Sequence, residues 1–99
     1  MTRKLPIISI EDFETKSKKR LMMKSMIDRI TEGVELNLES VNIAEIKNQN
    51  LILSLPKSEW KPGLKKAIDF YVEKEEYEKC SKIKDLIDQL WKNMLWLLL

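Results

Sequence analysis

The sequence contains no histidine, one cysteine and two glycines. Without histidine, a Ser-His or Cys-His nucleophile and a His-ligated metal site are excluded. Cys80 alone can form neither an internal disulfide nor a thiolate zinc site. Gly33 and Gly63 are far apart in the chain, which excludes the glycine-rich loops that bind phosphates and dinucleotides. We therefore expect a protein that is not an enzyme and that uses no metal and no cofactor.

Long hydrophobic runs are also absent. No segment approaches the roughly 20 apolar residues that a membrane-spanning helix needs. The start, "TRKLPIISI", has only a short apolar stretch before the acids of "EDFE", so we expect no secretory signal. The 99 residues carry a formal charge of only +2, and this length predicts one small domain over residues 1–99. We expect a cytoplasmic protein and do not expect a membrane partner.

The residues that are present predict a helix over 9–33. Ser9 and Asp12 have the spacing of a capping box, and Gly33 is a natural helix stop. Apolar residues recur at three- and four-residue spacing and share one face. These are Met23, Met26, Ile27 and Ile30.

The pattern changes after Gly33. "VELNL" alternates with period two, "LILSL" is a short apolar run, and "KNQN" between them is typical of a turn. We predict an extended segment or β-hairpin over 34–56. A short helix over "VNIAEIKN" is the alternative.

The third part, residues 62–95, predicts an antiparallel helical hairpin. Pro56, Pro62 and Gly63 mark a boundary, and Pro62 suits the first position of a helix. The first helix carries Leu64, Ala67, Ile68, Tyr71 and Val72 at helical spacing. The second carries a stripe roughly 140° wide, formed by Tyr77, Cys80, Ile83, Ile87, Leu90, Trp91 and Met94. A shift in apolar phase after Val72 favours the hairpin over one continuous helix, so the predicted fold class is mainly α.

Within this hairpin, "EEYEKCSKIKDLI" resembles the UVR motif, and the resemblance extends over residues 64–90. That motif is a small helical hairpin found at the C-terminus of UvrB, within UvrC, in McsA-like adaptors and in some Clp ATPases. Tyr77 stands at its aromatic position, Cys80 and Ser81 at its pair of small residues, and Ile83 at its Leu. Lys84 and Asp85 stand at its Arg-Asp step, and Ile87 at its final aliphatic position. The preceding helix, 64–73, has the place of the motif's first helix.

The resemblance implies a protein–protein docking element that pairs with another helical hairpin. On this basis the predicted function is that of an adaptor on a larger machine of DNA repair, transcription or protein quality control. Lys84 departs from the motif because an ammonium cannot make the two-pronged contact of a guanidinium. A homodimer is a further option that the sequence leaves open. The predicted partner-binding residues are Tyr77, Ile83, Lys84, Asp85, Ile87, Trp91, Trp96 and Leu97.

The C-terminal end, "LWKNMLWLLL", is apolar on all sides and forms a hydrophobic tail over 96–99. It either covers the N-terminal helix or inserts into a groove of a partner, where Trp is favoured. A membrane-surface anchor is the third and least favoured option. Such tails also resemble the sliding-clamp-binding ends of T-even-type phage late-transcription coactivators and polymerases, although those carry an Asp and a Phe that are missing here.

An alternative function is that of a nucleic-acid-binding accessory protein, such as a phage-type transcription or replication factor that uses its tail to bind a sliding clamp. Residues 1–33 hold eight Lys or Arg against five acids. The cluster that could contact phosphates is Lys16, Lys18, Lys19 and Arg20. Charge runs on helices are more often simply solvated, and no aromatic residue interleaves with these bases.

Overall fold

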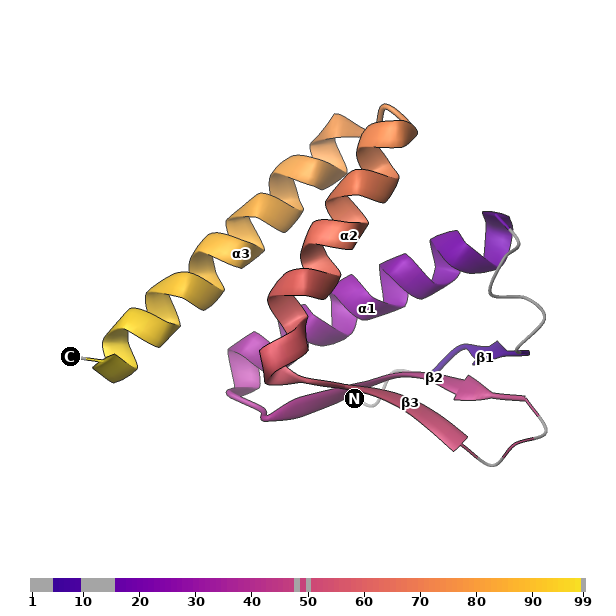
Figure 1. Cartoon of the computed structure of the whole chain (residues 1–99), viewed down its shortest axis with the longest axis horizontal. Helices are drawn as coiled ribbons and strands as arrows, with labels where there is room; N and C mark the ends of the chain where they lie inside the picture. Colours follow the sequence, from indigo (N-terminus) through magenta and orange to yellow (C-terminus); the bar gives the residue numbers. More distant parts are fainter. Residues whose placement is uncertain (1–4, 10–15, 48, 50, 99) are drawn as a thin grey trace. The chain divides into compact units, whose positions relative to one another are not determined.

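The computed structural model describes residues 5–9, 16–47, 49 and 51–98 (Figure 1). Their order is β1 (Ile7–Ile8), α1 (Lys16–Leu36), β2 (Ser40–Ile46), β3 (Leu51–Pro56), the 3₁₀ turn η2 (Lys57–Glu59), α2 (Trp60–Glu73) and α3 (Tyr77–Leu98). The described part is mainly helical with a small sheet, which confirms the predicted fold class. The chain forms two compact units, Met1–Lys57 and Ser58–Leu99.

The first unit is a three-stranded sheet with α1 packed on β2. β1 runs parallel to the central strand β2, and α1 is the crossover that a parallel connection requires. β2 and β3 pair antiparallel, so the predicted β-hairpin is confirmed. The helix considered over "VNIAEIKN" does not form, because Val41, Ile43 and Ala44 become buried in strand geometry. The strand β1 was not predicted, since two residues carry no detectable period.

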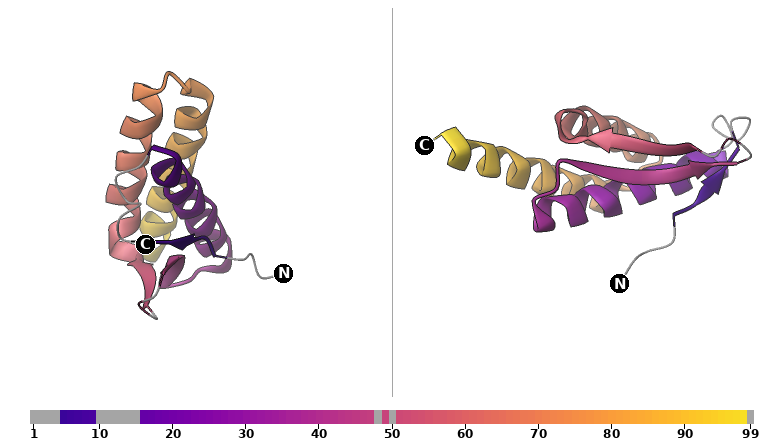
Figure 2. Two further views of the ribbon diagram at one scale, coloured as in Figure 1. Left: turned by 90° about the vertical axis from the view of Figure 1, so that its right-hand side faces the viewer. Right: turned by 90° about the horizontal axis from the view of Figure 1, so that it is seen from below.

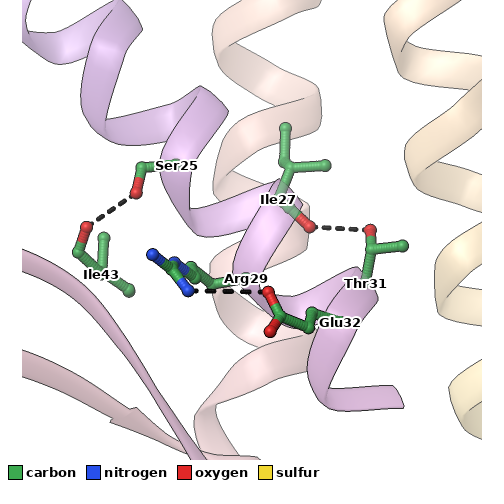
Figure 3. Close-up of polar contacts among 6 residues, drawn as sticks. All are labelled: Ser25, Ile27, Arg29, Thr31, Glu32 and Ile43. Carbon is green, nitrogen blue, oxygen red and sulfur yellow. Dashed lines mark hydrogen bonds and ion pairs between the residues drawn. The ribbon is translucent and has the colours of Figure 1, made fainter. Parts of the chain in front are cut away.

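A β-bulge in β2 directs two consecutive side chains into the core. Asn42 pairs with Ser54 and Ala44 with Leu53, so Ile43 is the extra residue between them. Ile8, Ile43 and Ala44 form the buried cluster of this unit, and Met22, Met26, Leu53 and Leu55 pack against it. A bulged residue leaves the regular ladder. Ser25 of α1 donates a hydrogen bond of 2.7 Å from its hydroxyl to the Ile43 carbonyl, which satisfies that group (Figure 3).

Two further contacts lie within α1. The Thr31 hydroxyl donates to the Ile27 carbonyl over 2.8 Å, and Arg29 is 3.5 Å from Glu32 (Figure 3). Of the predicted apolar face, Ile30 is fully buried, while Met23, Met26 and Ile27 are half-buried. The face was therefore located correctly.

The predicted helix stop at Gly33 is wrong. α1 continues to Leu36, and Asn37 adopts φ 55°. Leu38 N–H donates to Gly33 O and Asn37 N–H to Val34 O, which is the hydrogen-bond pair of a Schellman motif. The terminating left-handed position thus belongs to Asn37, a residue that tolerates it better than most. As a consequence "VEL" is the last turn of a helix and not the start of a strand.

The second unit is the predicted antiparallel helical hairpin, with α2 and α3 side by side (Figure 2). The buried side chains are Trp60, Leu64, Ala67, Phe70 and Tyr71 of α2, and Cys80, Ile83, Leu86 and Leu90 of α3. Phe70 and Leu86 lie outside the predicted apolar positions. The Cys80 thiol lies 3.7 Å from the Ile68 carbonyl and packs as a small buried side chain.

The turn between α2 and α3 has the same hydrogen-bond motif that ends α1. Glu75 has φ 59°, Glu76 N–H donates to Tyr71 O, and Glu75 N–H donates to Val72 O. These bonds satisfy the last carbonyls of α2 and reverse the chain within three residues. α2 begins at Trp60, so Pro62 is the third helical residue and not the first as predicted.

Two other predictions concern the ends of the chain. α3 extends to Leu98, so Trp96 and Leu97 belong to a helix and not to a separate tail. The predicted capping residue Asp12 lies outside the described residues. No helix of the described part is long and apolar enough to cross a membrane.

Candidate docking face on the helical hairpin

One surface of the second unit collects its exposed large hydrophobic side chains. Val72, Tyr77 and Trp91 are exposed by 46, 62 and 53%. Large side chains of this kind are usually covered in a folded protein, and a contiguous group of them marks an interaction site more often than isolated ones do. Their position on the two helices decides whether they form one group.

On α3, Tyr77, Lys84 and Trp91 are seven residues apart. Seven residues are close to two helical turns, so the three side chains lie within about 40° of one another. All three are exposed. Asp88, four residues after Lys84, is exposed on the same side. The row from Tyr77 to Trp91 is about 21 Å long at the rise of an α-helix.

On α2, Lys61 identifies the side that meets this row. Its ammonium lies 5.4 Å from the centre of the Trp91 ring, a cation–π distance. Lys65 and Val72 follow at helical spacing and are exposed, and so is Asp69. The Cys80–Ile68 contact joins the same two sides further along the hairpin. The two rows therefore form one surface, called the hairpin face below. It comprises Lys61, Lys65, Asp69, Val72, Tyr77, Lys84, Asp88 and Trp91.

The hairpin face has apolar groups at both ends and mixed charge between them. Val72 and Tyr77 flank the turn between the helices, and Trp91 lies near the start of α2. Three lysines and two aspartates occupy the space between. Such a composition resembles the anchor residues of protein interfaces, in which Tyr and Trp contribute most of the binding energy and charges set orientation.

Charged and aromatic side chains also make contacts around the turn between α2 and α3. Lys79 Nζ is 2.8 Å from Glu76 Oε1 and 5.1 Å from the Tyr71 ring. Lys74 Nζ lies 5.0 Å from the Phe70 ring, and the Phe70 and Tyr71 rings meet edge to face. Of these contacts, the one between Lys79 and the Tyr71 ring joins the first turn of α3 to the last turn of α2.

The predicted partner-binding residues divide into four groups. Tyr77, Lys84 and Trp91 lie on the hairpin face. Asp85 is exposed but about 100° from Lys84 around the helix, and so faces elsewhere. Ile83 is buried (1% exposed) and Ile87 half-buried, so they support the fold beneath the surface. The side chains of Trp96 and Leu97 lie outside the described part.

Residues of α2 complete the surface, and they were not among the predicted partner-binding residues. Val72 was assigned to the apolar side of its helix, and Lys61 and Lys65 were given no role. The seven-residue spacing of Tyr77, Lys84 and Trp91 was a usable signal for the α3 row. No local signal pairs that row with α2, because the pairing depends on how the two helices pack.

The C-terminal part of α3 extends well beyond the N-terminus of α2. Trp91 lies beside Lys61, in the first turn of α2. Residues 92–98 continue the helix for about 10 Å past that point and cannot pack along α2. The apolar residues 96–98 therefore belong to a helical extension of the hairpin.

Three residues of the predicted basic cluster, Lys16, Lys19 and Arg20, have the three- and four-residue spacing of one face of α1. Lys18 and Arg20 are two residues apart on α1, hence about 200° apart around it. Lys19 and Arg20 each already make an interaction, and the side chain of Lys16 lies outside the described part. Nucleic-acid binding through these residues stays a prediction.

No group of His, Cys, Asp or Glu side chains suited to holding a metal ion occurs in the described residues. Comparison of the chain with protein-family models, with curated proteins and with solved structures finds no match. Any functional assignment therefore depends on the residues and their geometry.

Proposed function

We propose that the protein is a non-enzymatic adaptor that docks onto a larger protein through the hairpin face. The observation that carries the proposal is the location of Val72, Tyr77 and Trp91, the large hydrophobic side chains exposed on the described second unit, on one surface. Exposing them costs free energy that a partner's apolar surface would recover. Two aromatic anchors about 21 Å apart, with Lys84 between them, match the length of a helix of roughly four turns.

The preferred partner is another helical hairpin. The resemblance of residues 64–90 to the UVR motif implies this mode, and a mainly helical partner can lay its own apolar ridge between Tyr77 and Trp91. DNA repair, transcription and protein quality control are the settings that the resemblance implies. The helical extension at 92–98 would add contact area beyond the N-terminus of α2.

The test is a comparison of captured partners between the unmodified chain and the double variant Tyr77→Ala/Trp91→Ala. The variant should lose the partner while keeping its circular dichroism spectrum, because both side chains are exposed and the Lys61–Trp91 contact is worth only about 0.5–1 kcal/mol at an exposed site. The matched control is Glu78→Ala/Gln89→Ala, which truncates two exposed α3 side chains away from the hairpin face.

Quantitative mass spectrometry identifies proteins that the unmodified chain and the control retain and the variant loses. Binding of the purified partner should then weaken at least tenfold in the variant, as expected when two aromatic anchors are removed. Equal binding by the variant and the unmodified chain would exclude the hairpin face as the docking surface.

A further inference from the structure

Among the described strands, β3 lies at the edge of the sheet, next to β2 only (Figure 1). Edge strands offer unpaired backbone groups to other chains, and proteins usually protect them with charged residues, proline or bulges. β3 has no charge between Leu51 and Leu55, and its single proline is the last residue. The bulge of this sheet is in β2, at Ile43, and so does not protect the edge.

The hydrogen bonds of β2 determine which groups of β3 face outward. Glu45 N–H donates to Pro6 O, and Lys47 N–H donates to Ile8 O, so alternate residues of β2 direct their backbone N–H and C=O groups toward β1. The backbone groups of Ala44 and Ile46 therefore face β3, where the register partners of these residues are Leu53 and Leu51. It follows that Ile52 and Ser54 direct their N–H and C=O groups away from the sheet.

Neither outward residue is covered by the rest of the described chain. Ile52 is 52% exposed and Ser54 is exposed. The Ser54 hydroxyl makes a 3.0 Å bond to Asn42 on the same strand pair, which leaves its backbone groups for the outer edge.

The sequence of β3 is complementary to itself when it is reversed. In "LILSL", an antiparallel pair centred on Leu53 places Leu51 opposite Leu55, Leu53 opposite Leu53, and Ile52 opposite Ser54. The Ile52–Ser54 pairs are the ones whose backbone groups face each other, so two copies would form four backbone hydrogen bonds. The leucines of both copies would meet in one row on the side of the sheet that carries α1.

We propose that two copies of this chain associate through antiparallel pairing of β3, centred on Leu53, and so form one six-stranded sheet. A second copy is the occupant that the pattern favours, because the same five residues supply both halves of the match. Dimerisation would cover the side chain of Leu51, which is 58% exposed. Strand pairs of this length bury less than the roughly 1,200 Å² of a standard interface, so the dimer should be weak and concentration-dependent.

The experiment exploits the pairing of residue 52 with residue 54 of the other copy. One variant carries Ile52→Lys and Ser54→Lys, and the other carries Ile52→Glu and Ser54→Glu. Each homodimer would place like charges opposite each other, whereas a mixed dimer would place Lys opposite Glu at every such pair. Both positions are exposed, and circular dichroism checks that the variants fold.

Sedimentation equilibrium should show a reversible monomer–dimer equilibrium for the full chain. Each charged variant should be monomeric over the same concentration range, and an equimolar mixture at low salt should form dimers again. The matched control, Glu35→Lys with Glu39→Lys, changes the charge at two exposed positions of the first unit outside β3 and should dimerise like the unmodified chain.

Several results would overturn the proposal. The unmodified chain could be monomeric at every concentration, the charged variants could dimerise as tightly as it does, or their mixture could stay monomeric. Loss of the dimer in Tyr77→Ala/Trp91→Ala would assign self-association to the hairpin face instead. If a charged variant does not fold, hydrogen exchange of the unmodified chain decides: the Ile52 and Ser54 amides should exchange at least tenfold more slowly at high concentration than at low concentration.

Discussion

Among the residues that the structure describes, two that are not glycine occupy the left-handed conformation, and both follow the end of a helix. Asn37 ends α1 and Glu75 ends α2, at φ 55° and 59°. Glycine is the usual residue at this position because it has no Cβ to clash with the backbone. Asn is the best-tolerated substitute, whereas Glu has no such advantage. The turn of the hairpin thus holds a local strain that α1 largely avoids.

Replacing Glu75 by Gly should stabilise the protein. Relief of the left-handed strain is worth about 1–2 kcal/mol, and the greater freedom of glycine in the unfolded chain removes part of it. We expect a net gain of about 0.5–1 kcal/mol in the free energy of unfolding, measured with urea. Asn37→Gly is the matched control and should gain less. A loss of stability in Glu75→Gly would show that its side chain contributes more than its backbone costs.

Ser25 also has a specific role. Its hydroxyl satisfies the Ile43 carbonyl at the bulge, in a partly buried setting. Ser25→Ala should lower the free energy of unfolding by about 1–2 kcal/mol, because the carbonyl loses its partner. Alanine is also the better helix former, which works against this loss. The exposed Ser81→Ala in α3 measures that gain alone, and equal effects of the two substitutions would contradict the assignment.

At the scale of the element, the sequence predicted helix and strand types better than their ends. The helical hairpin was predictable because apolar residues recur at helical spacing in both α2 and α3 and a charged turn separates them. The β-hairpin was predictable from two apolar segments around "KNQN". The end of α1 was not predictable, because Gly33 is a typical helix-ending residue and the helix nevertheless continues past it.

The side of α3 that is available for docking could also be identified only from the structure. Tyr77, Cys80, Ile83 and Trp91 all belong to one apolar stripe in the sequence. Packing against α2 divides that stripe, burying Cys80 and Ile83 and leaving Tyr77 and Trp91 exposed. The division depends on the side from which α2 approaches, and no property of α3 alone determines it.

Lys84 tests the electrostatic part of the docking proposal. It is exposed between two aromatic anchors, where its ammonium can reach a carboxylate of the partner while its stem covers apolar surface. Lys84→Glu should slow association with the partner a few-fold and make the rate less sensitive to salt. The unfolding midpoint should stay unchanged.

The control for this measurement is Lys82→Glu, an equal charge reversal at an exposed α3 position away from the hairpin face. A charge reversal on the partner should restore much of the rate lost in Lys84→Glu. If stopped-flow measurements give the same rate and salt dependence for both variants and the unmodified chain, Lys84 has no part in docking.

At the scale of the whole molecule, the chain divides into a sheet unit and a helical-hairpin unit. The helical extension at 92–98 belongs to the second unit and continues past the start of α2. Three functions were predicted for its apolar residues: covering the N-terminal helix, inserting into a groove of a partner, or anchoring the protein at a membrane surface. Because the extension continues past the start of α2, that helix does not supply a surface for it, and we propose the partner anchor.

Deleting Trp96 to Leu99 should therefore change the free energy of unfolding by less than about 1 kcal/mol, while partner binding weakens. Burial of even two of these side chains in the core would instead make the deletion cost several kcal/mol, at about 1.5–3 kcal/mol per fully buried large side chain. Urea denaturation and binding measurements on the same samples distinguish the two outcomes. The full-length variant Trp96→Ser/Leu97→Ser controls for the shortened helix.

The sequence by itself determined the mainly helical class, the hairpin of α2 and α3, and the strand character of β3, because these follow from local periodicity and turn chemistry. The absence of histidine and of paired cysteines likewise excluded whole classes of catalytic and metal sites. Only the tertiary structure decided which apolar residues of α3 are exposed and that Ser25 hydrogen-bonds to the Ile43 carbonyl at the bulge. It also decided that the backbone groups at the outer edge of β3 belong to Ile52 and Ser54. Each of these depends on how one element packs or pairs with another, and that information is distributed over residues far apart in the chain.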